Sequence, residues 1–403
     1  MVNVAILGFG TVGSGVADVL TMNHALIEQR AGKSVNLKYI LDVREFPDSP
    51  YKDCFVKDFS VIENDPSVDI VVETIGGATV ALDFTRRALS AGKSVVSSNK
   101  ELVATHGYDL LQLAKSKGVS YLFEASVGGG IPVLRPLTNC LAGNELSEVR
   151  GILNGTTNYL LTRMIRAGLS FEQALKEAQD NGYAERDPSA DIEGHDACRK
   201  ICILSALAFG RHVYPEQVST QGITAITLAD VDYANACGHK IKLLGRALRM
   251  DENKVCAYVA PHLVSTENPL AGVEDVFNAI AATGNAVGDV MFYGRGAGKL
   301  PTASAVVGDV VDIAKDVSKR KCNEWAAGDK SLVCSPDALT FRWYVRANGS
   351  LEAARAACGT ITPLARDGAP AQEIAFLTEA MTQAQLNENL SGLDVQSVIR
   401  VLG

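Results

Sequence analysis

The sequence predicts an α/β fold, with a doubly wound parallel sheet, a larger α+β domain and a small C-terminal α+β domain. Three observations predict it. Short apolar runs alternate with helix-like runs over the first 125 residues, longer helical segments follow from about Gly128, and strand-like and helix-like runs return after Ser335. Parallel strands must be joined by crossovers, which are usually helices, so the alternation indicates βαβ units.

The expected elements follow in chain order. Strands are expected at Val2–Leu7, Leu37–Leu41, Asp69–Glu73, Ser94–Ser97 and Ser120–Phe123, and helices from about Thr11, over Leu82–Ala91 and over Tyr108–Lys117. The polar run 23–34 could be an inserted loop. Ser170 and Gln173 have the spacing of a capping box for a helix over Phe171–Gln179, and a long helix is expected over Ile192–Phe209.

These elements suggest where the domains begin and end. We expect a first domain over residues 1–130, completed by a glycine-rich loop and helix at about 295–318, and a second domain over 131–294. Residues 319–334 are polar and irregular and are expected to form a linker. The last region, 335–403, has strand signals at Leu339–Val345 and Ser397–Leu402 and a helix signal at Glu373–Leu386.

Composition excludes several classes of function. The chain has 38 Lys and Arg against 46 Asp and Glu, a net charge of −8, which argues against a nucleic-acid-binding protein. No apolar stretch reaches the roughly 18 to 20 residues of a membrane-spanning helix. The nine cysteines show no CxxC pairs, and the first residues lack a basic leader. We therefore expect a cytoplasmic protein with reduced thiols.

The strongest local motif follows the first strand. Gly8-Phe9-Gly10-Thr11-Val12-Gly13 fits the pattern GxGxxG and opens a helix. In this context Gly8 permits a tight turn, Gly10 lets the backbone approach a pyrophosphate, and Gly13 allows close packing of helix on strand. The helix N-terminus also attracts phosphate. The motif predicts a Rossmann-type dinucleotide site, although a purely structural turn is the alternative.

The end of the second predicted strand bears on the choice of dinucleotide. A carboxylate at Asp42 could bind the ribose hydroxyls of NAD, whereas Arg44 could hold the 2′-phosphate of NADP. Both residues could also be ordinary surface charges. The sequence leaves NAD and NADP open.

Five further segments carry a resemblance to a known family. They are Val96–Glu101 (VSSNKE), Glu124–Pro132 (EASVGGGIP), Gly151–Tyr159 (GILNGTTNY), Gly182–Asp191 (GYAERDPSAD) and Gly194–Lys200 (GHDACRK). In this order and spacing they resemble the homoserine dehydrogenases, over residues 1 to about 318. The resemblance implies an NAD(P)-dependent interconversion of L-homoserine and L-aspartate 4-semialdehyde, a step toward threonine, isoleucine and methionine. It also implies that the second domain is the catalytic and dimerisation domain of a homodimer or homotetramer.

The resemblance also implies roles for individual residues. Lys200 is the proton donor or acceptor, Asp196 lies one helical turn earlier and can orient its ammonium, and Lys100 lies near nicotinamide and substrate. Without the resemblance, Lys200 and Asp196 could be an ordinary surface ion pair. The residues implied for the substrate are Glu185, Asp191, Gly155, Thr156 and Tyr183; those implied for the cofactor, besides the glycine motif and Arg44, are Thr74, Lys100 and Gly298.

The turn between Glu124 and Ile131 suggests a cation. Successive glycines leave carbonyl groups free to converge, Glu124 adds an anionic oxygen, and ligands that are all oxygen suit a hard cation. Family members bind a monovalent cation, usually sodium, and the matching positions are Glu124, Val127, Gly129 and Ile131. A flexible crossover between domains is the alternative.

The C-terminal region resembles the family's regulatory ACT domain only weakly. Such a domain is a βαββαβ unit that binds an amino acid such as threonine. Where it usually has an Asp-x-Pro-Gly turn, this chain has Arg346-Ala347-Asn348-Gly349-Ser350, in which Asn348 and Gly349 can still form a tight turn. We expect a folded ACT-like region that aids dimerisation, with weak or absent threonine feedback; a purely structural tail is the alternative.

Two other functions compete with the dehydrogenase. A semialdehyde dehydrogenase that forms a thioester would need an activated cysteine with a base, and no cysteine lies in a loop suited to that role. A non-catalytic regulator that senses NAD would bind dinucleotide but would tolerate loss of Lys200.

Overall fold

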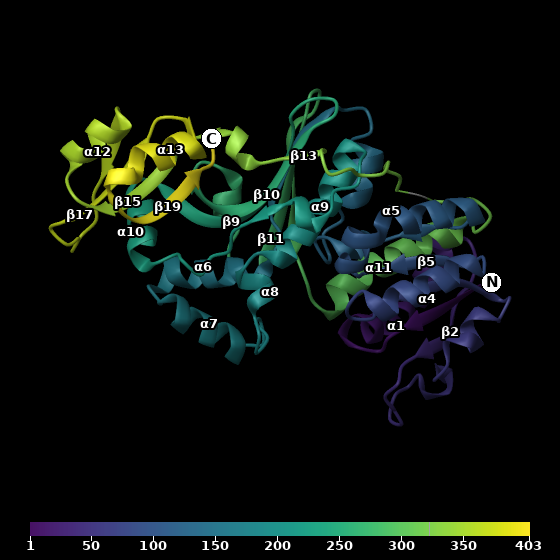
Figure 1. Ribbon diagram of the computed structural model, residues 1–403. Coiled ribbons are helices and arrows are strands. Elements are labelled where there is room, and N and C mark those ends of the chain that lie inside the picture. The colour runs from purple at the N-terminus through teal and green to yellow at the C-terminus, as the bar shows by residue number, and fades with distance from the viewer. Residues whose placement is uncertain (322) are drawn as a thin grey trace. The chain divides into compact units, whose positions relative to one another are not determined.

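A computed structural model describes all 403 residues except Cys322, and it divides the chain into two compact units (Figure 1). The first unit comprises Met1–Leu146, Cys202–Pro215 and Thr283–Asp329, and the second comprises Ser147–Ile201, Glu216–Ala282 and Lys330–Gly403. The second unit includes the C-terminal residues that were expected to form a domain of their own.

The first unit is built on a six-stranded parallel sheet in the order β3-β2-β1-β4-β5-β6. The strands are β1 (Val2–Leu7), β2 (Val35–Leu41), β3 (Phe55–Val56), β4 (Val68–Glu73), β5 (Ser94–Ser97) and β6 (Tyr121–Leu122). The strand order reverses at β1, so β1 lies between β2 and β4 at the switch point where doubly wound sheets bind ligands. The predicted α/β class with a parallel sheet is confirmed.

Helices complete this unit: α1 (Thr11–Met22), α2 (His24–Ala31), α3 (Phe59–Glu63), α4 (Thr79–Ser90), α5 (Lys100–Lys117) and α11 (Lys299–Lys315). Helices α1 and α11 pack together, and α4 packs on α5 (Figure 1). Alternate strand residues, Val4 and Ile6 on β1 and Ile70 and Val72 on β4, are buried in one core with α1 and α11. This alternation is expected for strands covered by helices on both faces.

Three details differ from the sequence prediction. The polar run 23–34, expected as a loop, contains helix α2, which is amphipathic only weakly and buries Ile27 and Ala31. Helix α5 begins at Lys100 rather than at Tyr108, because the Asn99 side chain accepts a hydrogen bond from the Leu102 N–H and caps it. Strand β3 has two residues, too few to give a periodic signal.

The second unit contains one long sheet in the order β11-β7-β9-β10-β19-β15-β17-β16. Its first strands are β7 (Leu146–Ile152), β9 (His239–Arg249), β10 (Val255–Ser265) and β11 (Phe277–Gly284), and short strands β8 (Ser219–Thr220) and β13 (Val333–Cys334) pair with β10. β9 pairs antiparallel with both β7 and β10. The helices are α6 (Gly155–Ala167), α7 (Phe171–Asp180), α8 (Ser189–Ile192), α9 (His195–Phe209) and α10 (Leu228–Ala236).

Helix boundaries in this unit follow local chemistry. The capping box predicted at the start of α7 is confirmed, since Ser170 accepts from Gln173 N–H and the Gln173 side chain accepts from Ser170 N–H. The single helix predicted over Ile192–Phe209 is wrong at its start. The chain turns at Gly194, whose φ of +87° favours glycine, so α8 and α9 are separate helices.

The C-terminal residues form a βαββαβ module. Its elements are β15 (Trp343–Asn348), α12 (Leu351–Cys358), β16 (Ile361–Leu364), β17 (Glu373–Thr378), α13 (Gln383–Asn389) and β19 (Asp394–Val401). β19 pairs antiparallel with β15 and, at its end, parallel with β10. The module therefore continues the sheet of β7, β9 and β10 within the second unit. Short strands β14 (Thr340–Phe341) and β18 (Met381–Thr382) pair separately.

One element of this module was predicted wrongly. The helix expected over Glu373–Leu386 is strand β17 followed by helix α13, which starts only after Thr382. A capping box between Thr382 and Gln385 fixes that start. The run from Glu373 to Thr378 forms a strand because it lies between β15 and β16 in the sheet, a long-range pairing that outweighs local preference.

The segment expected as a linker, residues 319–334, has ordered contacts where it is described; Cys322 within it lies outside the described residues. Trp325 is buried against Gly107 and Phe123.

No helix among the described residues has the length and apolar character needed to cross a membrane.

A buried ion pair attaches the module to α10. Arg346 Nε on β15 donates to Asp230 Oδ1 at 2.8 Å, and the Tyr344 hydroxyl donates to the same oxygen at 3.0 Å. Asp230 is fully buried, and its other oxygen accepts the Thr227 N–H as part of the α10 cap. Burial raises the pKa of Tyr344, and the Asp230 carboxylate adds to that effect, so the tyrosine stays a donor.

We expect Asp230→Ala to lower the free energy of unfolding by about 3 kcal/mol, because the buried Arg346 guanidinium keeps only Glu373 as a carboxylate partner and the Tyr344 hydroxyl loses its acceptor. Urea unfolding followed by circular dichroism measures this. The control is Asp232→Ala, which removes an exposed carboxylate from the same helix and should change the free energy by less than about 0.5 kcal/mol. Equal effects of the two substitutions would contradict this account.

Candidate active site

The glycine motif has the geometry of a phosphate-binding loop. Gly8 has a φ of +89°, and Gly10 is the N-cap of α1 with no side chain capping the helix. A Cβ at Gly13 would lie 1.9 Å from the Gly8 carbonyl oxygen, so only glycine fits, whereas a Cβ at Gly10 would meet nothing within 4 Å. The fold thus needs Gly13, while the open space at Gly10 suits a ligand that lies against the backbone.

Thr74 supports this loop from the neighbouring strand. Its hydroxyl donates to the carbonyl oxygens of Leu7 and Gly8, at 2.9 and 3.0 Å. Asn99, which follows β5, holds the loop after β4, because its side-chain amide donates to the carbonyl oxygens of Ile75 and Gly77. Lys100 follows as the first residue of α5, at the carboxyl end of β5.

The carboxylate of Asp42 is used within the protein. It accepts the Phe9 N–H at 2.7 Å and is held by the Arg44 guanidinium, with Nε and Nη2 at 3.0 and 2.9 Å. Arg44 lowers the pKa of Asp42 well below its usual range. Lys57 donates to the carbonyl oxygens of Val43 and Arg44. The cationic side chains of Arg44 and Lys57 therefore lie together beyond the end of β2. In such folds the adenosine ribose of a dinucleotide binds at this place.

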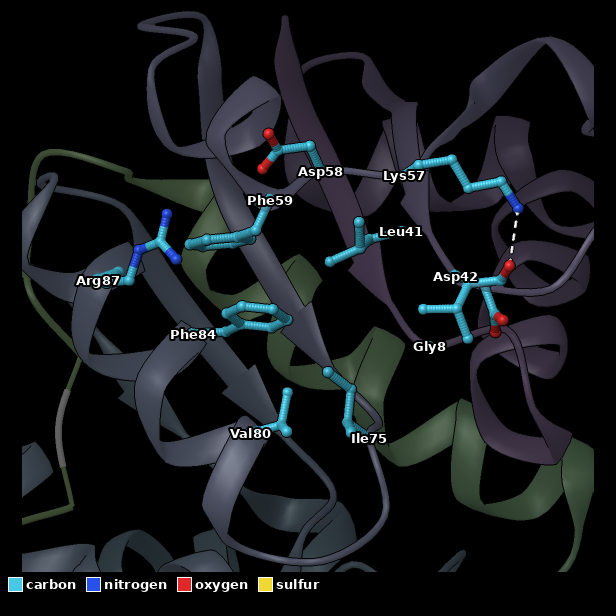
Figure 2. A pocket seen from close by; sticks show the side chains of 11 residues that line it. Gly8, Leu41, Asp42, Lys57, Asp58, Phe59, Ile75, Val80, Phe84 and Arg87 are labelled. Atoms are coloured by element: carbon cyan, nitrogen blue, oxygen red, sulfur yellow. Dashed lines mark hydrogen bonds between the residues drawn. The ribbon is translucent and has the colours of Figure 1, made fainter.

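Next to this group lies a cavity of about 360 Å³ (Figure 2). Apolar side chains from β2, the loop after β4 and helices α3 and α4 line it, and Lys57, Asp58 and Arg87 bring charge. The rings of Phe59 and Phe84 stack at 4.6 Å, and Arg87 lies over Phe59. Flat apolar walls with polar groups beside them are typical of a site for a flat heteroaromatic ring.

In the second unit, Lys200 is held by two short hydrogen bonds. Its Nζ lies 2.7 Å from the Leu153 carbonyl oxygen and 2.7 Å from Asp196 Oδ2, and its side chain is buried. The alternative of an ordinary surface ion pair does not fit this burial. An ammonium with partners fixed in this way is oriented before any substrate arrives.

Asn154 links this pair to a second carboxylate. Its side-chain nitrogen donates to Asp191 Oδ1 at 2.7 Å and to Asp196 Oδ2 at 2.9 Å, while its side-chain oxygen accepts the Thr157 N–H and caps α6. Burial raises the pKa of Asp191, and the nearby Asp196 carboxylate raises it further. Sequence reasoning missed Asn154 as a functional candidate, although its place before a helix marked it as a possible cap.

The remaining expected substrate residues lie around the start of α6 and in the loop after α7. Gly155 and Thr156 are the first residues of α6, and the Thr156 hydroxyl donates to the Tyr183 carbonyl at 2.8 Å. Tyr183 is exposed and its ring lies 4.9 Å from that of Tyr159. Glu185 is also exposed, and its carbonyl accepts from Gln179.

A fully buried lysine contacts α6, and the sequence did not identify it as a candidate site residue. Lys242 on β9 donates to Asn158 Oδ1 at 3.1 Å and to the Val273 carbonyl. Burial lowers the pKa of Lys242 to about 8. Asn158 in turn donates to the carbonyls of Val273, Asp275 and Phe277. An apolar strand pattern gives no sign of such a contact, because it depends on packing between distant segments.

Comparison with known proteins identifies the family. The family models described as homoserine dehydrogenase and as homoserine dehydrogenase, NAD binding domain, match residues 132–311 and 8–124. The homoserine dehydrogenase of Bacillus subtilis (strain 168) is 42% identical over 320 residues, which cover 78% of this chain and 73% of that protein. The chain belongs to the homoserine dehydrogenase family.

Solved structures agree with this family. A homoserine dehydrogenase from Thiobacillus denitrificans matches 100% of this chain and 98% of its own with a TM-score of 0.90 at 34% identity. A hyperthermophilic archaeal homoserine dehydrogenase in complex with NADPH matches 77% of this chain and 97% of its own, with a TM-score of 0.65 at 28% identity.

The expected function is confirmed. The protein is an NAD(P)-dependent oxidoreductase, a homoserine dehydrogenase that interconverts L-homoserine and L-aspartate 4-semialdehyde. The comparisons give no support to a thioester-forming semialdehyde dehydrogenase or to a non-catalytic regulator. The open backbone at Gly10 and the uncapped start of α1 fit a dinucleotide cofactor.

In the turn expected to bind a cation, the Glu124 side chain accepts hydrogen bonds from backbone N–H groups. Glu124 Oε1 accepts the N–H groups of Val133 and Leu134, at 2.6 and 2.8 Å, and Oε2 accepts that of Arg135 at 2.9 Å. We expected this carboxylate to lend an anionic oxygen to the cation, but both oxygens already have N–H partners. Among the described residues there is no cluster of three His, Cys, Asp or Glu side chains able to hold a metal ion.

The glycine loop near residue 298 packs against this turn. A Cβ at Gly129 would lie 2.4 Å from the Gly296 carbonyl oxygen, and Gly130 N–H donates to the Arg295 carbonyl. Gly298 has a φ of +125° and is the N-cap of α11. The backbone at Gly296 therefore packs closely on the turn at 128–130 of the same unit, and the assignment of Gly298 to the cofactor stays a prediction.

We expect Gly10→Val to abolish NADP(H) binding without changing the thermal unfolding temperature, because the added side chain fills open space rather than clashing with protein atoms. Gly13→Ala is the matched variant: its Cβ clashes with Gly8, so it should lower both stability and binding. Titration of NADPH fluorescence together with thermal unfolding separates the two. Wild-type NADPH affinity in Gly10→Val would contradict the proposed phosphate loop.

Proposed function

We propose that Lys200 gives the proton to the substrate oxygen when the aldehyde is reduced and takes it back when homoserine is oxidised. The observation that carries this is the pair of 2.7 Å hydrogen bonds from Nζ to Leu153 and Asp196. An ammonium has three N–H groups, so we assign the third to the substrate oxygen. Bound NAD(P)H supplies the hydride to the carbonyl carbon.

Asp196 keeps the ammonium in place and offsets its charge while it is buried. Since the proton leaves Lys200 as negative charge develops on the substrate oxygen, the same group acts as acid and as electrostatic stabiliser. Asn154 donates to the same Asp196 oxygen as Lys200 does, which holds that carboxylate in place. We assign Lys100 to the neighbourhood of nicotinamide, in line with the resemblance.

The substrate is an α-amino acid, and we assign its two charged ends to different groups. The carboxylates of Asp191 and Glu185 suit the α-ammonium. The start of α6 offers backbone N–H groups at Gly155 and Thr156 and the positive end of a helix of 13 residues, which suits the α-carboxylate. Tyr183 is tied to this site by the hydrogen bond that Thr156 donates to its carbonyl.

We expect Lys200→Ala to reduce kcat by roughly 10²- to 10⁴-fold while leaving the affinity for NADPH unchanged. Steady-state assays with homoserine and fluorescence titration measure the two quantities. Lys176→Ala, which removes an exposed lysine from α7, serves as the control. If Lys200→Ala kept more than about a tenth of the wild-type kcat, Lys200 would not be the general acid.

We further propose that NADP is the preferred cofactor. Asp42 is neutralised by Arg44 and is occupied by the Phe9 N–H, so it is a poor partner for ribose hydroxyls. Arg44 and Lys57 present positive charge beside it, and a guanidinium fits a phosphate well. The archaeal relative described in complex with NADPH supports the same choice.

We expect Arg44→Ser to raise the KM for NADP⁺ by about 10- to 100-fold, because a charge-assisted hydrogen bond contributes roughly 1.5–3 kcal/mol. The KM for NAD⁺ should stay the same or fall, since Asp42 becomes available. Arg86→Ser, an exposed arginine on α4, is the control. An equal rise in both KM values would mean that Arg44 only supports the loop.

For the cation we propose a site in which the backbone carbonyl oxygens of Glu124, Val127, Gly129 and Ile131 hold sodium. The positive φ angles of Gly128 and Gly129, +74° and +53°, give the turn that such convergence requires. A cation there would be structural.

We also assign the protein to the cytoplasm and to a homodimer or homotetramer. Sedimentation would test the oligomeric state.

The C-terminal module has the ACT-like βαββαβ order, and we propose that it gives weak or no threonine feedback. Its altered turn is closed by hydrogen bonds to residues that are distant along the chain: Asn348 Nδ2 donates to Asp394 at 2.8 Å, and the Gly349 N–H donates to the Gln372 carbonyl. These contacts occupy groups that an effector would need.

Threonine titrated into the full-length enzyme should therefore leave the rate of homoserine oxidation nearly unchanged. Full-length protein is required, because truncation would remove β19, the neighbour of β10 in the sheet. Leucine serves as a control for nonspecific effects. Strong, saturable inhibition by threonine alone would show that the altered turn still binds an effector.

A further inference from the structure

Two cysteines face each other on neighbouring strands far apart in sequence. β13 runs parallel to β10, with Val333 beside Val255 and Cys334 beside Cys256. Residues directly paired on adjacent strands point their side chains to the same face. Neighbouring strands lie about 4.8 Å apart. A disulfide joins Cα atoms roughly 4.4 to 6.8 Å apart, so the pair meets the main requirement.

The side chains of these cysteines share one environment. Cys256 is fully buried in the core between β10 and the C-terminal module, and Cys334 packs against the same core from its edge. Cys334 Sγ donates to the carbonyl oxygen of Val255 at 3.4 Å, so this sulfur is directed at β10, one residue from its partner. Both cysteines are free thiols.

Their exposure gives them different roles. Cys334 is partly exposed, whereas Cys256 is fully buried. Burial raises the pKa of Cys256 to about 12, and the neighbouring Cys334 adds to that effect, so Cys256 stays a thiol at neutral pH. The partly exposed Cys334 can meet an oxidant, and the neighbouring Cys256 can resolve the product if it loses its proton as it attacks.

We propose that Cys256 and Cys334 are an oxidisable pair that forms an intramolecular disulfide when it reacts with hydrogen peroxide. Cys334 sulfur attacks the peroxide, the O–O bond breaks, and a sulfenic acid and one molecule of water form. Cys256 sulfur then attacks the sulfenic sulfur, and the hydroxyl group leaves with the thiol proton as a second water. Two thiols are oxidised by two electrons, and one molecule of hydrogen peroxide is reduced.

The bond would fix the start of the C-terminal module to the central sheet. β13 directly precedes the residues that form the module, and β10 is the strand to which the module's last strand, β19, also pairs. The disulfide would close a long loop, which restricts the unfolded chain. Oxidation should therefore stabilise the module's attachment without touching the residues assigned to substrate.

Peptide mapping tests the proposal directly. Trypsin releases Cys256 in the peptide Val255–Arg295 and Cys334 in Ser331–Arg342, and each peptide contains a single cysteine. Full-length enzyme is treated with hydrogen peroxide, alkylated, digested without reductant and analysed by mass spectrometry. We expect the two peptides joined, two hydrogens lighter than their sum, and separated again by dithiothreitol.

Variants distinguish this pair from other thiols. The joined species should be absent from Cys334→Ser and from Cys256→Ala, which keeps the buried position apolar. It should persist in Cys140→Ser, an exposed thiol, and in Cys358→Ser, which lies in the same core. Sulfinic or sulfonic acid at Cys334 with no joined peptide, or a joined peptide that contains Cys358, would overturn the proposal.

Thermal unfolding gives a second measurement that does not depend on the buried variant folding. Peroxide should raise the Tm of the wild type by roughly 5 °C, and dithiothreitol should reverse this. Cys334→Ser changes a partly exposed residue and should show no such rise. An unchanged wild-type Tm despite complete linkage would refute the predicted attachment of the module.

Discussion

The candidate substrate site depends on one side chain, the amide of Asn154. Its oxygen caps α6, and its nitrogen holds Asp191 and Asp196 together, which in turn fixes Lys200. An amide is suited to this because it offers a donor and an acceptor at once without adding charge. The partly buried Asp191 carboxylate and the buried Asp196 carboxylate repel each other, and a donor shared between them offsets part of that cost. The start of α6, Asp191 on α8 and the start of α9 are therefore held together by the same group.

Backbone geometry, rather than charge, sets the cofactor loop. Gly13 is required because the helix approaches the strand so closely that a single carbon would clash with Gly8, and Thr74 fastens the loop from the next strand. Gly10 is different, since the protein leaves its Cβ position open. One glycine serves the fold and the other serves the ligand. We propose that the cationic side chains of Arg44 and Lys57 favour NADP at this loop.

The C-terminal module is part of the second unit's sheet. β19 pairs with β10, and the buried Arg346 bonds to Asp230 on α10, so the module is held by both backbone and side-chain contacts. Its start is held by β13, where Cys334 lies beside Cys256. A change within the module would have to alter this shared sheet in order to reach the substrate residues. Because the module is held by the sheet, the closed turn at Asn348 is compatible with a folded, attached module.

The sequence by itself determined what depends on local chemistry. The GxGxxG turn, the strand–helix alternation and the Ser170–Gln173 cap all follow from neighbouring residues, and five ordered motifs sufficed for the family. It misjudged the start of α5 by eight residues and assigned a helix to β17, because an N-cap and a sheet neighbour decided those segments. Only the tertiary structure decided that the Asp42 carboxylate is spent on Phe9 and Arg44, that Glu124 accepts three N–H groups, and that Lys242 supports α6. The physical reason is common to them: each depends on which distant donors and acceptors packing brings within about 3 Å, and a pattern along the chain does not contain that distance.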